Sequence, residues 1–212
     1  MASQRLQTLA SLCPTHGPLV DIGSDHGQLL AILFRQGFNF ALYGSELSSS
    51  SFQSLKKSVE DYPFRLYQAD GLTHLPSEVI TVVIAGMGGL LIIEMLTKGN
   101  ASLSTVQTLV LGPQRDVHKL RHWLADHGWM ITEEKFVLEA DQGYPLLVAQ
   151  RGQMRLTDIE ASYGPILIKH RDPVFLNWLR LEQLSLSKAL ALHDNKDKQT
   201  RLDWINHYVN IR

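Results

Sequence analysis

The sequence contains a single cysteine, Cys13, among its 212 residues. One cysteine excludes an internal disulfide framework and any metal cluster held by several thiolates of one chain. The chain also lacks a large excess of charge of either sign, because it has 20 lysines and arginines and 21 aspartates and glutamates. This near-neutral balance by itself gives no sign of nucleic acid. We expect a protein of a reducing compartment that binds no metal.

A long hydrophobic run is missing as well. The most apolar stretch, residues 79–96, is interrupted by Thr81, by three glycines and by Glu94, whereas a membrane-spanning helix needs about 20 mostly apolar residues. Near the N-terminus, Gln4 and Arg5 stand where a signal peptide would carry its apolar segment. We therefore expect a cytoplasmic protein that makes no contact with a membrane.

What the chain does contain is enough apolar sequence for one substantial core. Hydrophobic residues make up 44% of the chain and charged residues 19%, an ordinary globular balance. The charge is distributed unevenly: residues 1–150 carry 10 basic and 14 acidic side chains, whereas residues 151–212 carry 10 and 7. A basic C-terminal segment is compatible with a contact to phosphate, and equally with a solvated helical face.

Up to residue 151, short apolar runs alternate with amphipathic runs, which is typical of βαβ units around a parallel sheet. Three of the four amphipathic runs end at a glycine suited to a left-handed C-cap. The last two apolar runs are joined by too few residues for a crossover helix, so they should form an antiparallel hairpin. We predict an α/β fold whose seven-stranded sheet is mostly parallel with one antiparallel strand. The predicted strands are residues 18–22, 40–44, 64–68, 79–85, 109–111, 131–138 and 144–150, and the predicted helices are 28–36, 48–60, 90–98 and 117–127.

The C-terminal part of the chain has a helical pattern instead. Residues 157–160 form a capping-box pattern, and an Asp-Pro pair at 172–173 marks a second helix start. Apolar residues at near-helical spacing follow, and a polar break at residues 194–198 precedes a last amphipathic run. The sequence thus predicts a domain over 1–152 and a helical hairpin over 153–212.

The sharpest motif is Asp-Ile-Gly-Ser-Asp-His-Gly at residues 21–27, between the first predicted strand and the first predicted helix. In an open α/β sheet, ligands bind beyond the carboxyl ends of the strands. The motif does not match the dinucleotide pattern G-x-G-x-x-G, and its two aspartates would repel a pyrophosphate. S-adenosyl-L-methionine has no phosphate and carries an ammonium and a sulfonium, which carboxylates favour. We predict that Asp21, Gly23, Ser24 and Asp25 bind this cofactor.

Two further strand ends carry acids. Glu46 follows Asp21 at a spacing near that at which an acid hydrogen-bonds ribose hydroxyls. Asp70 can accept a hydrogen bond from an adenine amino group, and Gly71 lets the backbone approach the ring. Any one of these acids alone could be a helix cap or a turn residue. Three aligned strand ends favour a cofactor site, to which we assign Glu46, Leu47, Asp70 and Gly71.

Gly86-Met87-Gly88-Gly89 follows the fourth predicted strand. Three glycines in four residues indicate backbone that closely approaches the cofactor or a flat base; the alternative is a tight turn with Met87 as core filler. The acid or amide followed by two prolines that amino-directed DNA methylases usually carry is absent. We assign Gly86, Met87 and Gly88 to the cofactor and Gly89 to the substrate.

Polar side chains at two strand ends are candidates for facing a base. Gln114 follows the fifth predicted strand and could read a base through its amide, although it could equally belong to a turn before a helix. His26 is the second candidate, and its alternative role is to cap the first helix. We take His26 and Gln114 as candidate catalytic residues and Arg115 as a substrate contact.

In their order along the chain, these motifs resemble those of the bacterial tRNA (adenine-22-N1)-methyltransferase family. The chain departs from the family at Gly27, where alanine is usual, and at Gly112-Pro113-Gln114, which replaces a Gln-Pro-Asn pattern. The resembling segments are Asp-Ile-Gly-Ser-Asp-His at 21–26, Gly-Ser-Glu at 44–46, Asp-Gly-Leu at 70–72, Ala-Gly-Met-Gly-Gly at 85–89 and Leu-Arg-x-Trp-Leu at 120–124.

The resemblance implies a Rossmann-like class I methyltransferase domain that binds S-adenosyl-L-methionine, and a helical C-terminal extension that helps to hold tRNA. It implies that adenine N1 attacks the sulfonium methyl in line, without prior deprotonation, so that positioning of the base dominates. We expect Arg171, Lys196 and Lys198 to contact tRNA, and the protein to be a monomer or a weak dimer.

Two other classes of function stay open at this point. One is a methyltransferase that acts on another RNA position, on a protein or on a metabolite. The other is a non-catalytic RNA-binding module that keeps S-adenosyl-L-methionine as a structural ligand. The three aligned acids argue against lost cofactor binding.

Overall fold

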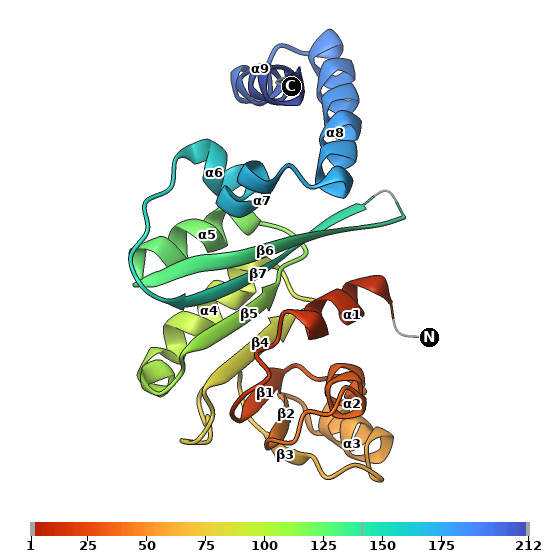
Figure 1. The fold of residues 1–212 in the computed structure, drawn as a ribbon, viewed down its shortest axis with the longest axis vertical. Coiled ribbons are helices and arrows are strands. Elements are labelled where there is room, and N and C mark those ends of the chain that lie inside the picture. The colour runs from red at the N-terminus through yellow and green to blue at the C-terminus, as the bar shows by residue number, and fades with distance from the viewer. Residues whose placement is uncertain (1–2, 141, 211–212) are drawn as a thin grey trace.

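A seven-stranded sheet runs through the part of the chain described by this computed structural model, residues 3–140 and 142–210 (Figure 1). Its strands are β1 Leu19–Ile22, β2 Leu42–Glu46, β3 Arg65–Gln68, β4 Thr81–Ala85, β5 Thr108–Gly112, β6 Trp129–Glu139 and β7 Gln142–Arg151. The helices of the same residues are α1 Gln4–Ser11, α2 Gln28–Arg35, α3 Ser49–Ser58, α4 Gly89–Lys98, α5 Val117–Asp126, α6 Asp158–Tyr163, α7 Pro165–His170, α8 Pro173–Leu192 and α9 Lys196–Asn210, with a short 3₁₀ helix at Asn100–Ser104.

The order of the strands across the sheet is β3-β2-β1-β4-β5-β7-β6. All neighbours from β3 to β5 are parallel, whereas β7 is antiparallel to both β5 and β6. The prediction of one antiparallel strand near an edge is therefore confirmed. The seven strands and four helices predicted between residues 18 and 151 are all present, and each begins and ends within two residues of its predicted bounds.

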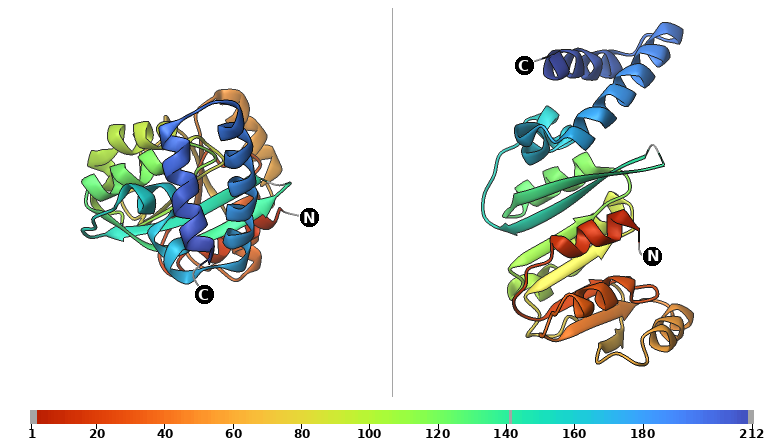
Figure 2. Two further views of the ribbon diagram at one scale, coloured as in Figure 1. Left: turned by 90° about the horizontal axis from the view of Figure 1, so that it is seen from above. Right: turned by 45° about the vertical axis from the view of Figure 1, so that its right-hand side comes forward.

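The central strands are buried and mostly apolar because helices cover both faces of the sheet (Figure 2). Successive residues of a strand point to opposite faces, so Val82 packs with α4 and α5 in one core cluster and Val83 packs with α1 and α2 in another. This arrangement leaves the carboxyl ends of β1, β4 and β5 accessible at one edge.

Two of the three predicted glycine caps have the expected backbone. Gly37 and Gly128 follow α2 and α5 at φ +87° and +73°, the left-handed region. Gly99, after α4, has φ −86° instead. A Cβ at this position would lie 2.3 Å from Cβ of Leu72, so close packing, and not a left-handed turn, requires glycine here.

The C-terminal segment contains two short helices, α6 and α7, in addition to the predicted hairpin of α8 and α9. The capping box at Thr157 and Glu160 is present, and Asp172 accepts the first backbone N–H groups of α8. The polar break is shorter than expected, because α9 begins at Lys196. Lys196 and Lys198 therefore lie in the first turn of a helix and not in a connection.

A third core cluster holds the C-terminal helices together and includes a residue of the sheet. Phe136 of β6 packs against Phe175 and Trp178 of α8, with ring centroids 5.4 and 4.9 Å apart. Figure 1 shows α6 to α9 beyond the β6 edge of the sheet. The hydrophobic face of these helices is thus completed by β6.

A buried ion pair joins the sheet to the C-terminal helices. Nε of Arg121, on α5, donates to Glu134 Oε1 of β6 at 2.9 Å, and Arg121 also donates to the Ala161 carbonyl at 2.8 Å. The second oxygen of Glu134 accepts the Ile166 N–H at 2.9 Å, in the first turn of α7. Both charged side chains are almost fully buried. Their bonds fix α6 and α7 against α5 and β6.

Candidate functional site

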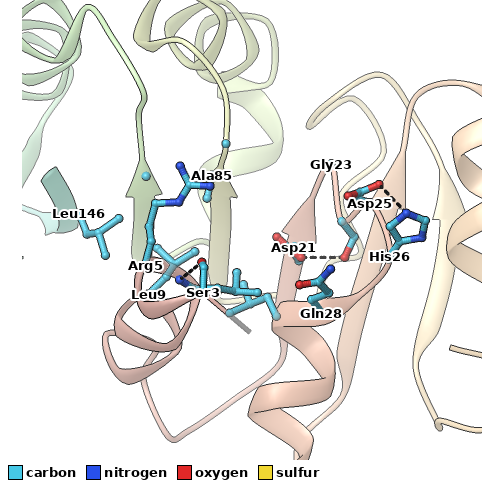
Figure 3. Close-up of a pocket in the computed structure, with 15 residues that line it drawn as sticks. Ser3, Arg5, Leu9, Asp21, Gly23, Asp25, His26, Gln28, Ala85 and Leu146 are labelled. Carbon is cyan, nitrogen blue, oxygen red and sulfur yellow. Dashed lines mark hydrogen bonds and ion pairs between the residues drawn. The ribbon is translucent and has the colours of Figure 1, made fainter. Parts of the chain in front are cut away.

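A cavity of about 200 Å³ opens at the carboxyl edge of the sheet, beneath α1 (Figure 3). It lies against the turn after β1 and the ends of β4 and β5. Its lining comprises Ser3, Arg5, Leu6, Leu9, Asp21, Gly23, Ser24, Asp25, His26, Gln28, Leu29, Ala85, Gly86, Gly112 and Leu146. The four predicted cofactor residues of the β1 turn are thus brought together at one cavity.

The turn after β1 holds a buried carboxylate. Asp21 is 6% exposed, and its Oδ2 accepts a 2.7 Å hydrogen bond from the Ser24 hydroxyl. Burial raises the pKa of Asp21 to about 7; the Ser24 hydrogen bond opposes this rise and the charge of Glu46 adds to it. Burial disfavours the charged form of Asp21 because it removes the carboxylate from water. A positively charged ligand in the cavity would offset this loss and favour the ionised carboxylate.

The end of β2 is tied to the same turn. Asp25 has φ +50°, and its backbone N–H donates to Glu46 Oε1 at 2.5 Å. One oxygen of Glu46 therefore fixes the turn. No hydrogen bond from the described residues engages the other oxygen, which leaves an acceptor for a hydroxyl group.

The predicted ligands on β2 and β3 lie outside the 200 Å³ cavity. Asp70 is exposed after β3, Gly71 has φ +56° and packs against Met95, and Leu47 is 62% exposed after β2. Because β1, β2 and β3 are parallel neighbours, these residues continue the same edge of the sheet. A long ligand would extend from the cavity along this edge.

The glycine loop after β4 forms the next wall. Gly86 lines the cavity at φ +78°, and a Cβ added there would meet no atom within 4 Å, so this backbone faces open space. Met87 lies across the β1 turn, since a Cβ on Gly23 would be 2.3 Å from the Met87 methyl. Met87 therefore packs against the turn that lines the cavity.

Backbone hydrogen bonds join this loop to the loop after β5. Gln114 N–H donates to the Met87 carbonyl, and Gly89 N–H donates to the Arg115 carbonyl, both at 2.8 Å. A Cβ on Gly89 would lie 2.7 Å from the Asp116 carbonyl oxygen. Gly89, predicted to contact substrate, is buried and permits this close approach. Gly88 instead faces the Arg115 side chain, with Nε 2.9 Å from a Cβ built there.

The two candidate base-facing residues lie at different cavities. His26 is exposed at the first cavity, with Nδ1 3.1 Å from the Ser58 hydroxyl and Nε2 3.7 Å from Asp25. It does not cap α2, whose N-cap is Gly27. Gln114 lines a second cavity of about 120 Å³, between the β6–β7 hairpin and α8.

The predicted tRNA contacts of the C-terminal segment differ in their surroundings. Nη1 of Arg171 donates to the Tyr208 carbonyl at 3.0 Å, and the guanidinium lies 4.7 Å from the centroid of the Tyr208 ring. Arg171 thus helps to hold α9 in place through Tyr208. Lys196 and Lys198 are exposed, and Arg115 is exposed at the loop after β5.

Helix α1 contributes cavity residues that were not predicted. Ser3, Arg5, Leu6 and Leu9 all line the cavity, and the Ser3 hydroxyl caps the helix by accepting the Leu6 N–H. The cap residue and the spacing of Leu6 and Leu9 are the signals that could have identified this helix.

Two features are absent from the described residues. No group of three or more histidine, cysteine, aspartate or glutamate side chains is arranged to hold a metal ion. No helix in this part of the chain combines the length and the apolar character that crossing a membrane requires.

The chemistry of the site fits S-adenosyl-L-methionine. A buried carboxylate with a raised pKa suits a ligand that carries positive charge, and Glu46 offers an acceptor to ribose hydroxyls. Any side chain at residue 86 would occupy the open space next to Gly86, so glycine keeps this space available to a ligand.

Comparison with known proteins agrees with this fit. A family model described as tRNA (adenine(22)-N(1))-methyltransferase matches residues 19–211. The tRNA (adenine(22)-N(1))-methyltransferase of Bacillus subtilis strain 168 is 30% identical, over 94% of this chain and 92% of that protein. The crystal structure of Streptococcus pneumoniae Sp1610 in complex with S-adenosyl-L-methionine superposes with a TM-score of 0.90 and 32% identity, over 99% of this chain and 100% of that one. S-adenosyl-L-methionine is therefore the cofactor, and the chain belongs to the tRNA (adenine(22)-N(1))-methyltransferase family.

Proposed function

We propose that this protein methylates N1 of adenine 22 in tRNA with S-adenosyl-L-methionine, in the cytoplasm. The observation that carries the proposal is the cavity in which the acidic turn after β1 meets the glycine loop after β4, within a chain of this family. The family supplies the substrate, and the cavity supplies a place where a flat base can meet the cofactor.

Acidic residues along three neighbouring strand ends would hold the cofactor. Asp21 favours its positive charge, the free oxygen of Glu46 accepts from its ribose hydroxyls, and Asp70 accepts from its adenine amino group. When bound, S-adenosyl-L-methionine supplies an electrophilic methyl group. Gly23, Gly86 and Met87 shape the wall against which it lies.

The protein needs no general base for this reaction, since the lone pair of adenine N1 is free at neutral pH. Its task is to hold the base in line, and well-oriented groups can supply about 7–11 kcal/mol of the barrier. The joined loops after β4 and β5 suit this task, because two backbone hydrogen bonds hold them in one arrangement. His26, at the first cavity, and Gln114, in the loop after β5, are the candidate contacts to the base.

The two binding functions belong to successive segments of the chain. Residues 1–152 carry the cofactor site, and residues 153–212 hold tRNA through exposed cations such as Lys196 and Lys198. Arg115, exposed beside the glycine loop, is suited to a phosphate next to the target nucleotide. Arg171 supports this surface indirectly, by holding α9.

Tritiated S-adenosyl-L-methionine and a tRNA transcript test the proposal. We expect tritium in N1-methyladenosine after digestion to nucleosides. The matched control is the same transcript with guanosine at position 22, which should accept no methyl group. Methylation of the control would move the target to another position, and no methylation of either RNA or of bulk tRNA would contradict the proposed function.

A further inference from the structure

Arg5 places a guanidinium at the wall of the cofactor cavity. We infer that Arg5 binds the carboxylate of the methionine part of S-adenosyl-L-methionine. The inference deepens the proposed function, on whose cofactor site it rests.

The backbone that carries Arg5 is fixed to the edge of the sheet. Its own N–H donates to Glu139 Oε1, at the end of β6, at 2.8 Å. One turn later Leu9 is 1% exposed and belongs to the core cluster that α1 shares with α2. Arg5 thus projects from a helix that is held at both ends.

The guanidinium is directed by an aromatic ring and not by a carboxylate. Its central carbon lies 4.6 Å from the centroid of the Tyr144 ring, a cation–π contact. Within the residues that the structure describes, no acidic side chain forms an ion pair with it. Its donors are therefore available to an anion, and a guanidinium matches a carboxylate with two parallel hydrogen bonds.

Charges of opposite sign stand on different sides of the cavity. Figure 3 shows Arg5 beside the strand that ends at Ala85, and Asp21 and Asp25 on the opposite side, in the β1 turn. The amino-acid end of the cofactor carries an ammonium and a carboxylate on one carbon. A site with carboxylates on one side and a guanidinium on the other is complementary to such a zwitterion.

An RNA phosphate is the other anion that this chemistry could bind. Arg5 is half-buried and lines the cavity itself, whereas a phosphate of a folded RNA would stay at the rim. The cofactor carboxylate is the ligand that can reach the interior.

Calorimetry on the full chain with two ligands tests the inference. S-adenosylhomocysteine keeps the amino-acid end, and 5′-methylthioadenosine lacks it. We expect Arg5→Met to weaken S-adenosylhomocysteine binding about 10- to 100-fold and to leave 5′-methylthioadenosine binding unchanged. Arg5→Lys should recover part of the loss, because it keeps the charge without the planar fork.

Arg35→Met is the matched control, since it removes an arginine of α2 that bonds to the Tyr62 hydroxyl outside the cavity. Both ligands should bind it as they bind the unaltered protein. An equal loss of both ligands in Arg5→Met would mean that Arg5 only supports the shape of the site, and would overturn the inference. Unchanged S-adenosylhomocysteine binding, with or without a loss of tRNA affinity, would overturn it too. Methylation of the tRNA transcript by the unaltered protein is scored separately, so the two proposals can fail independently.

Discussion

The hydroxyl of Ser24 donates a 2.7 Å hydrogen bond to Asp21, and both side chains are buried in the turn after β1, where we propose that the cofactor binds. A hydrogen bond to the charged form lowers the pKa of a carboxyl group, but here burial outweighs it and the pKa of Asp21 is about 7. The site therefore contains a carboxylate that takes up a proton close to neutral pH.

The affinity for S-adenosyl-L-methionine should rise between pH 6 and pH 8. A positively charged ligand binds the ionised form of Asp21, so below pH 7 binding must release a proton and weakens up to about tenfold per pH unit. Calorimetry in buffers of different ionisation enthalpy measures this proton release. Asp21→Asn should bind weakly, with no pH dependence in this range. An equally flat profile for the unaltered protein would contradict the prediction.

The same variant should be more stable than the unaltered protein when no ligand is bound. The folded-state pKa of Asp21 is raised above the unfolded value, so its contribution to stability is fully present below about pH 4 and is lost as the pH rises through 7. At pH 8, Asp21→Asn should raise the free energy of unfolding by on the order of 1 kcal/mol or more. Urea denaturation at pH 5 and pH 8 checks whether the gain in the free energy of unfolding is larger at the higher pH.

Two substitutions at Glu46 should separate its two hydrogen-bonding roles. Glu46→Ala removes the acceptor of the Asp25 N–H and the acceptor proposed for ribose, and should weaken cofactor binding by about 1.5–3 kcal/mol. Glu46→Gln keeps an oxygen for Asp25 but loses the charge, so its loss should be smaller. Equal and unaltered affinities in both variants would remove Glu46 from the site.

Adjacent glycines in the loop after β4 should respond differently to alanine. Gly89→Ala places a Cβ 2.7–2.8 Å from two backbone carbonyl oxygens, and should separate the paired loops, abolish methyl transfer and lower the melting temperature. Gly88→Ala meets the flexible side chain of Arg115 instead, so the fold should persist. Thermal melts and methylation of tRNA measure both effects. A fully active Gly89→Ala would show that the loops need not be joined.

The buried ion pair should be strongly coupled. Arg121→Met leaves the Glu134 carboxylate buried without its counter-charge and should cost about 3–5 kcal/mol of stability. The double variant Arg121→Met, Glu134→Met should be less destabilised than the sum of the single variants, because it leaves no unpaired charge. Additive losses in urea unfolding would mean that the pair acts only through packing.

Charge reversal at the start of α9 tests whether the C-terminal helices hold tRNA. With Lys196→Glu and Lys198→Glu together, tRNA affinity should fall and the slope of log affinity against log salt should decrease by about 2, roughly 0.9 per lost phosphate contact. Reversal of Lys56 and Lys57, exposed on α3, is the matched control and should leave both quantities unchanged. Truncation is a poorer test, since it would uncover Phe136.

The α/β part of the fold was predictable because its central strands are short and buried on both faces, which makes them mostly apolar runs. The strand ends then pointed to Asp21 and Glu46 as candidates, and the structure places both at the turn after β1, since parallel strands have their carboxyl ends at one edge. Helix α1 was not predicted, although Ser3 at its start and the spacing of Leu6 and Leu9 are typical of a short helix. Its four cavity residues could not be anticipated, because they reach the site by tertiary packing.

Particular contacts also explain where the structure of the C-terminal segment differs from the prediction. Polar residues at 194–198 suggested a connection, but Asn195 accepts the Lys198 N–H and starts α9 there. The predicted contact of Arg171 with tRNA stays a prediction, but its bond to Tyr208, 37 residues away in the chain, was not foreseen. Contacts at that sequence separation leave no local pattern.

The position of β7 between β5 and β6 constrains how the chain can assemble. Among the described residues, β6 has no strand neighbour other than β7, although β6 comes first in the sequence. Residues 129–139 therefore belong to the sheet only through their pairing with residues 142–151, and the two strands attach to β5 as one hairpin. Because backbone N–H groups at the start of α7 donate to the Glu134 carboxylate of β6, the docking of the C-terminal helices, and with it the surface proposed for tRNA, depends on this hairpin.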